Sequence, residues 1–102
     1  MTDESYKNLV GRIREQVSEP ARLMQFAEEC TEAAQAALKV ARILDGSNPT
    51  PTTLEQAREN LREELGDVMN AAAVLGIEPK REEQERKTLR WWSRIQVMKG
   101  GD

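Results

Sequence analysis

Histidine is absent from this sequence of 102 residues, which also has only one cysteine and four aromatic side chains. Without histidine, the chain cannot use a Ser/His/Asp or Cys/His catalytic arrangement. One cysteine, Cys30, cannot form an internal disulfide or a cysteine-rich zinc site, and we expect it to pack as a small apolar residue. Any metal ion bound by this chain would therefore be held by oxygen atoms.

Long apolar runs are missing as well, since the longest is AAAVLGI at residues 71–77, which is too short to cross a membrane. The first residues, MTDES, do not have the pattern of a signal peptide. There are 15 basic and 18 acidic residues, and the net charge of −3 argues against nonspecific nucleic-acid binding as the main activity. We expect a cytoplasmic protein with neither a membrane nor a nucleic acid as its partner.

The residues that are abundant favour helices. Leucine, alanine, glutamate, arginine and glutamine dominate, and proline and glycine cluster in a few places, so we expect an all-α fold with one domain over residues 1–102. The first predicted helix covers about Asp3 to Val17. The second is capped by Ser18, and its apolar residues repeat at helical spacing as far as Leu44.

Residues 45–52, DGSNPTPT, predict a turn because none of their glycine, asparagine and proline residues extends a helix. Thr53 and Gln56 then form a capping-box pattern, and the third helix continues until Gly76. The fourth begins near Pro79, with Leu89, Trp92 and Ile95 on one side. Stripes of alanine in the second and third helices allow close approach, which predicts a central antiparallel hairpin.

Acidic residues interrupt the apolar stripes of this hairpin. At about 100° per residue, Glu29 and Glu64 fall within the apolar faces, and Glu32 and Asp67 fall at their edges. Glu29 and Asp67 lie at equal chain distances from residue 48, as do Glu32 and Glu64, and the turn is centred there. All four carboxylates should therefore meet at one level of the hairpin. The negative charges of four carboxylates this close repel one another, and a divalent cation would remove that repulsion. Mg²⁺ or Mn²⁺ suits such an all-oxygen site.

The two acidic patterns also resemble known motifs. Glu28-Glu29-Cys30-Thr31-Glu32 and the later Glu64-Leu65-Gly66-Asp67 are similar to the EExxE and ExxD motifs of MazG-type nucleotide pyrophosphohydrolases, in the all-α NTP pyrophosphatase superfamily. The resemblance covers about residues 20–95. It implies a four-helix MazG-like fold and Mg²⁺-dependent cleavage of a nucleoside triphosphate between the α and β phosphates, giving a monophosphate and pyrophosphate. The metal ligands would be Glu29, Glu32, Glu64 and Asp67.

Further residues are candidates for binding the nucleotide. Lys87, Arg90 and Arg94 share a face of the fourth helix, resemble basic positions of the family, and suit the neutralisation of phosphate oxygens, although a solvated face is the alternative for each. Asn70 either contacts the nucleotide or is an exposed polar residue. Trp92 is in line with Leu89 and Ile95, which favours packing over stacking on a base.

A metal-activated water would attack the α phosphorus, with Glu28 or a metal-site acid such as Glu29 as the general base. The apolar surface of the second helix is too broad for one short chain to cover, so we expect a homodimer or homotetramer that forms a helical bundle. Two alternatives stay open: a noncatalytic helical interaction module on the same scaffold, and a related phosphoribosyl-ATP pyrophosphatase.

Overall fold

The protein consists of four α-helices, described here from a computed structural model that covers residues 1–100. Helix α1 spans Asp3–Gln16, α2 spans Glu19–Asp45, α3 spans Leu54–Leu75 and α4 spans Arg81–Met98. No strand occurs among residues 1–100, so the predicted all-α class and the count of four helices are confirmed. The final two residues of the predicted domain, 101–102, lie outside the described residues.

Helices α2 and α3 begin and end at residues whose chemistry explains the boundary. The side chain of Ser18 accepts a hydrogen bond from the Ala21 amide at the start of α2. At the start of α3, Thr53 and Gln56 form the predicted capping box. Helix α2 ends at Gly46, which has φ of 67° and so adopts the left-handed conformation that glycine tolerates best.

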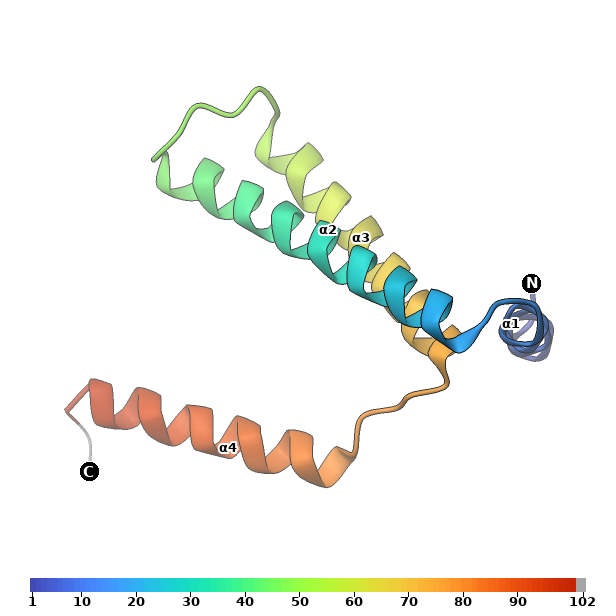
Figure 1. The fold of residues 1–102 in the computed structure, drawn as a ribbon. Helices are drawn as coiled ribbons and strands as arrows, with labels where there is room; N and C mark the ends of the chain where they lie inside the picture. The colour runs from blue at the N-terminus through green and yellow to red at the C-terminus, as the bar shows by residue number, and fades with distance from the viewer. Residues whose placement is uncertain (101–102) are drawn as a thin grey trace.

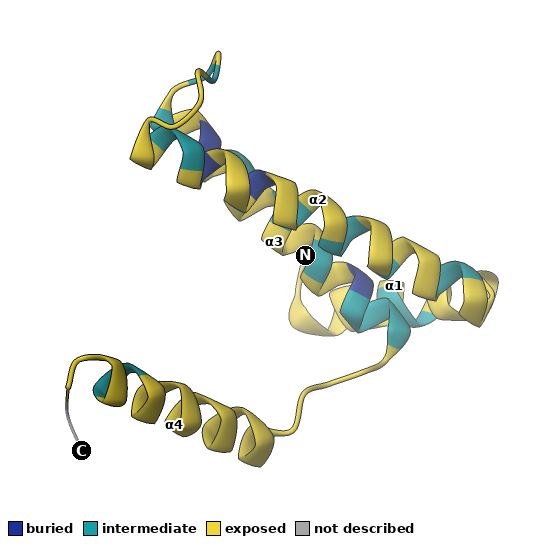
Figure 2. Ribbon diagram, turned by 60° about the vertical axis from the view of Figure 1, so that its left-hand side comes forward, coloured by how far each residue is buried: buried dark blue, intermediate teal, exposed yellow. Residues whose placement is uncertain are grey.

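Helices α2 and α3 pack side by side as an antiparallel hairpin (Figure 1), and the small core of the protein lies between them. The buried residues are Ala36 and Val40 from α2 with Ala57 and Ala71 from α3, shown in dark blue in Figure 2. Because three of these four are alanines, the two backbones can approach closely. Gly66 has no such role, since a Cβ atom there would meet nothing within 4 Å.

Helix α1 crosses the hairpin near the end of α3 and packs against that helix (Figure 1). The Tyr6 hydroxyl donates a hydrogen bond of 2.7 Å to Asn70 Oδ1. The guanidinium of Arg14 lies against Gly76, so close that a Cβ atom at this glycine would be 2.6 Å from Arg14 Nη2. Gly76 also has φ of 76°, and these two constraints together explain why α3 ends at a glycine.

Helix α4 lies apart from the hairpin, to which the segment 76–80 connects it, in both Figure 1 and Figure 2. It begins at Arg81, after Pro79, as the sequence predicts, but nearly all its residues are exposed. The predicted packing of Trp92 is not found within the single chain, since this side chain is 58% exposed. The apolar side of α4 thus has no partner helix in its own chain.

None of the helices within residues 1–100 combines the length and the apolar character needed to span a lipid bilayer.

Candidate functional site

Three acidic side chains meet between the two helices of the hairpin. Glu29 comes from α2, and Glu64 and Asp67 come from adjacent turns of α3; one oxygen from each lies within 4.8 Å of the others. Glu64 occupies the stripe of α3 that faces α2, seven residues from both Ala57 and Ala71. The contacts of these buried alanines therefore hold the carboxylates of the two helices near one another.

The local environment of these carboxylates leaves polar atoms unsatisfied. Glu29 Oε2 and Glu64 Oε2 are both buried and have no hydrogen-bond partner. The other oxygen of Glu29 accepts a hydrogen bond of 2.7 Å from Gln25 Nε2. The ion pairs among residues 1–100 are Arg62 with Glu59 and Arg81 with Glu85, so no arginine or lysine forms an ion pair with the three carboxylates. Buried carboxylate oxygens without hydrogen-bond partners are a cost to the folded state.

The charge state of Glu29 is perturbed by the same surroundings. Burial raises the pKa of its carboxyl above the ordinary value, and the charges of Glu32 and Asp67 raise the pKa further. The hydrogen bond from Gln25 lowers the pKa of Glu29, and hydrogen bonding with Glu32 raises it, with a net upward shift. Glu29 therefore holds its proton more tightly in the folded protein than in the unfolded chain.

This shift predicts how the stability of the metal-free protein depends on pH. As the pH falls through the raised pKa of Glu29, the folded state takes up a proton before the unfolded state does, so the free energy of unfolding should rise. The gain should stop once the pH reaches the ordinary glutamate value, where the unfolded chain is protonated too. Urea titrations in EDTA measure this trend, and Glu29→Gln should remove it; a wild-type protein that loses stability over this pH window would contradict the prediction.

The remaining acidic candidates lie beside the cluster. Glu32 is exposed and is not one of the three convergent carboxylates, but it is close enough to affect the pKa of Glu29. Glu28 is also exposed, and lines a shallow groove on α2 with Thr31 and Glu32. The structure thus brings together three of the four predicted metal ligands and places Glu28 outside the group.

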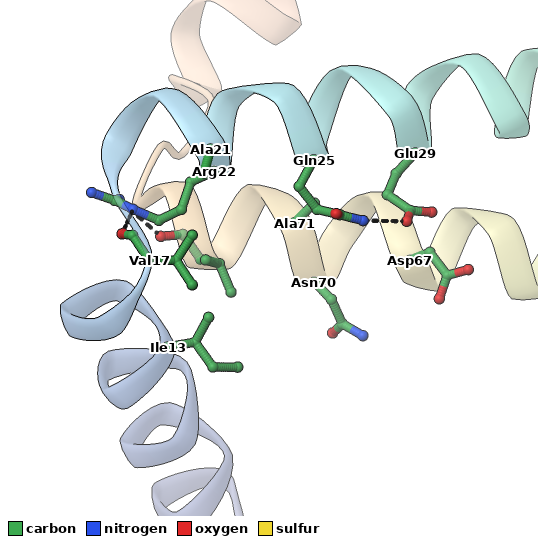
Figure 3. A pocket seen from close by; sticks show the side chains of 10 residues that line it. Ile13, Val17, Ala21, Arg22, Gln25, Glu29, Asp67, Asn70 and Ala71 are labelled. Carbon is green, nitrogen blue, oxygen red and sulfur yellow. Dashed lines mark hydrogen bonds between the residues drawn. The ribbon is translucent and has the colours of Figure 1, made fainter.

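A cavity of about 440 Å³ opens next to the carboxylates, between α1, α2 and α3 (Figure 3). Its polar side carries Glu29, Asp67 and the predicted Asn70, together with Gln25 and Arg22. Its apolar side is formed by Ile13 of α1, Val17 just after that helix, Ala21 of α2, and Ala71 and Val74 of α3. This combination of an apolar wall with a few convergent polar groups is typical of a small-molecule site.

Several residues of this cavity could not be assigned to a site from the sequence. Ile13 and Val17 carry an ordinary helical apolar pattern, which places them in a core without indicating what they face. Arg22 is half-buried, and donates hydrogen bonds to the carbonyl oxygens of Val17 at 3.1 Å and Val74 at 3.2 Å, as Figure 3 shows. These two hydrogen bonds connect the start of α2 to the residue that follows α1 and to the last turn of α3.

The basic candidates are not brought to the carboxylates within one chain. Lys87, Arg90 and Arg94 are exposed on α4, which lies apart from the hairpin (Figure 1). Cys30 is half-buried on α2.

No known family model, curated protein or solved structure matches this chain significantly.

Proposed function

We propose that this protein is a Mg²⁺-dependent nucleoside triphosphate pyrophosphohydrolase of the MazG type, which cleaves between the α and β phosphates and acts in the cytoplasm. The observation that carries this proposal is the convergence of Glu29, Glu64 and Asp67, which have two buried oxygens without a hydrogen-bond partner and no ion pair among residues 1–100. The resemblance of their sequence motifs to EExxE and ExxD, on two successive helices, gives independent support.

The donor set fits a hard divalent cation. All the available ligand atoms are carboxylate oxygens, which Mg²⁺ and Mn²⁺ prefer, and a site with few protein ligands retains positions for water and phosphate. Glu29, Glu64 and Asp67 would hold the ion, with Glu32 beside them as the fourth ligand of the proposed set. The ion would supply charge neutralisation for the phosphates and a lowered pKa for the attacking water.

Proton transfer from the attacking water requires a general base. Of the two candidates, Glu29 lies in the cluster and Glu28 lies outside it, so Glu29 is the better placed. Glu28 remains the alternative base if another helix or chain approaches its exposed side.

The adjacent cavity suits the nucleoside part of the substrate. Its volume of about 440 Å³ is within the usual range for ligand pockets, and its apolar wall could contact a base. Asn70 lines this cavity, and its Oδ1 accepts a hydrogen bond from Tyr6, which fixes the orientation of the amide toward a base or sugar.

The negative charge of a triphosphate needs more cations than the cavity carries. We propose Lys87, Arg90 and Arg94 for this role, because they share one face of α4 and suit phosphate oxygens. The role requires α4 to approach a carboxylate cluster. The proposed MazG-like helical bundle, as a homodimer or homotetramer, would allow that approach between chains.

A substrate panel tests this function. Purified protein with Mg²⁺ or Mn²⁺ should convert at least one nucleoside or deoxynucleoside triphosphate into the monophosphate and pyrophosphate, and EDTA should stop the reaction. Separation of the products by ion-exchange chromatography identifies the bond that is broken. Release of orthophosphate as the sole inorganic product would contradict the proposal. Phosphoribosyl-ATP belongs in the panel, since turnover of this compound alone would establish the alternative substrate.

The exposed apolar faces of the single chain favour one other candidate, a noncatalytic helical interaction module. Such a protein would not need the carboxylates to bind a metal, so Mg²⁺ should leave its melting temperature unchanged. A proposed enzyme should instead melt at a higher temperature with Mg²⁺, because a ligand that binds only the folded state stabilises it.

A further inference from the structure

The two carboxylate oxygens of Glu29 have different surroundings in the folded chain. Oε1 accepts a hydrogen bond of 2.7 Å from Gln25 Nε2, whereas Oε2 is buried and has no hydrogen-bond partner. Figure 3 shows both side chains extending from the same face of α2, with a dashed line for the hydrogen bond between them. One oxygen of Glu29 is therefore held by the protein, and the other is available to a ligand.

The position of the two residues on α2 accounts for this hydrogen bond. Gln25 precedes Glu29 by four residues, which places the two side chains one above the other on the helix surface. In the part of the chain that the structure describes, Glu29 is the one member of the carboxylate cluster that α2 contributes. The orientation of Glu29 thus decides whether the cluster spans both helices, and Gln25 restricts that orientation.

An amide is well suited to hold a carboxylate that binds a metal. The side chain of Gln25 carries no charge, so its N–H group orients Glu29 without supplying the positive charge of a lysine or arginine. A cationic side chain at this position would compete with the ion for the same carboxylate. Hydrogen-bond partners of metal ligands generally fix the orientation of the ligand, and their loss lowers metal affinity roughly 10- to 100-fold.

The same hydrogen bond should contribute little to the stability of the fold. Gln25 is exposed, and it lines the cavity together with Glu29 and Asp67. A hydrogen bond between accessible groups replaces hydrogen bonds to water, so its net contribution to folding is small. A change at Gln25 should therefore alter what Glu29 binds without altering how the chain folds.

We infer that Gln25 is a positioning residue for the metal site: it holds Oε1 of Glu29, so that Oε2 is left for the ion shared with Glu64 and Asp67. Gln25 acts through Glu29 and is not itself a ligand of the ion. The inference rests on the metal site of the proposed function. It does not depend on which nucleotide is the substrate, because the hydrogen bond acts on metal binding alone.

Binding of Mn²⁺ in the absence of nucleotide tests this role. Gln25→Met keeps the length and the helix propensity of the side chain but removes the N–H donor. Its dissociation constant for Mn²⁺, measured from the electron paramagnetic resonance signal of the free ion, should be at least about tenfold higher than that of the wild type. Its melting temperature in EDTA should match the wild type, and Gln25→Ala is the second variant if Gln25→Met fails to fold.

Gln35→Met is the matched control for this change. Gln35 is exposed on the same helix, about 15 Å along its axis from Gln25, and lies outside the carboxylate cluster. The substitution replaces the same atoms, so the dissociation constant for Mn²⁺ should stay at the wild-type value.

Turnover gives a readout that a purely structural residue would not give. In Gln25→Met, the Mn²⁺ concentration for half-maximal turnover should rise by about the same factor as the dissociation constant. The kcat at saturating Mn²⁺ should recover to near the wild-type value, because the ligands and the reacting groups are all present once the ion is bound.

A double-mutant cycle shows whether Gln25 acts through Glu29. Glu29→Asp keeps the negative charge but withdraws the carboxylate from Gln25 by one carbon–carbon bond. Adding Gln25→Met to this background should therefore raise the dissociation constant for Mn²⁺ much less than in the wild type, since coupled residues are not additive.

Four outcomes would overturn the inference. An unchanged affinity in Gln25→Met would mean that the hydrogen bond does not position Glu29, and an equal loss in the Glu29→Asp background would mean that Gln25 acts independently of Glu29. A clearly lower melting temperature in EDTA would make the role structural. A wild-type protein that binds no Mn²⁺ would contradict both this inference and the proposed function. Weaker Mn²⁺ binding by Gln25→Met, in a protein that hydrolyses no triphosphate, would support the inference and contradict the proposed function.

Discussion

Replacing Glu64 with glutamine should lower the Mg²⁺-dependent turnover of a nucleoside triphosphate at least about a hundredfold. Glu64 projects from α3 toward α2 and has a buried oxygen without a hydrogen-bond partner. Glutamine keeps the size of the side chain but removes the negative charge that a divalent cation requires. Steady-state rates at saturating Mg²⁺ measure the loss, and Mg²⁺ should raise the melting temperature of this variant much less than that of the wild type.

The melting temperature of the same variant without metal shows whether Glu64 acts as a metal ligand or as a residue that stabilises the fold. Without a cation, Glu64 belongs to a group of like charges, so Glu64→Gln in EDTA should melt at or above the temperature of the wild type. Glu63→Gln is the matched control, because Glu63 is the neighbouring residue, is exposed and lies outside the cluster. Full activity in Glu64→Gln would contradict the metal-site hypothesis. An equal loss of activity in Glu63→Gln would show that the effect is not specific to the carboxylate cluster.

Enlarging Ala57 to leucine should destabilise the fold by about 1–3 kcal/mol. Ala57 is 2% exposed and is the most buried core residue, where α3 contacts α2. Three added carbon atoms would force the two helices apart or into strained rotamers, and the core has few other residues that could adjust. Urea unfolding measured at one protein concentration gives the difference in the free energy of unfolding.

Ala34→Leu is the control for this change, because Ala34 is exposed on α2 and lies nearly opposite the buried positions Ala36 and Val40. It adds the same atoms without placing them between the helices, so its stability should stay within about 0.5 kcal/mol of the wild type. If Ala57→Leu were as stable as Ala34→Leu, the helices would not be as close as the alanine contacts indicate.

The sequence predicted the helices well because their boundaries depend on local chemistry. Ser18, Thr53 with Gln56, and Gly76 act through hydrogen bonds and backbone preferences within a few residues, and each is found at the predicted boundary. Helical periodicity likewise predicted that acidic residues of two helices would converge. The structure refines this prediction, since Glu29 meets both Glu64 and Asp67 while Glu32 remains at the edge.

The rest depends on how the helices are placed in space, which local patterns do not encode. Ile13 and Val17 look like ordinary core residues in the sequence, and only the crossing of α1 over α3 turns them into a wall of the cavity. The same limit applies to α4: its apolar spacing predicted that Trp92 packs, but spacing alone cannot tell whether the partner helix belongs to the same chain or to another.

The alanine contacts also bear on the ion that the proposed site would select. Ala57 and Ala71 flank Glu64 along α3, and their small side chains set how closely α2 and α3 approach at the level of the carboxylates. Mg²⁺ demands near-octahedral coordination at about 2.1 Å, whereas Ca²⁺ accepts more ligands at longer distances, so the spacing of the two helices would decide which ion the proposed site prefers. Side chains that bind no ligand would then set the ionic selectivity of the protein.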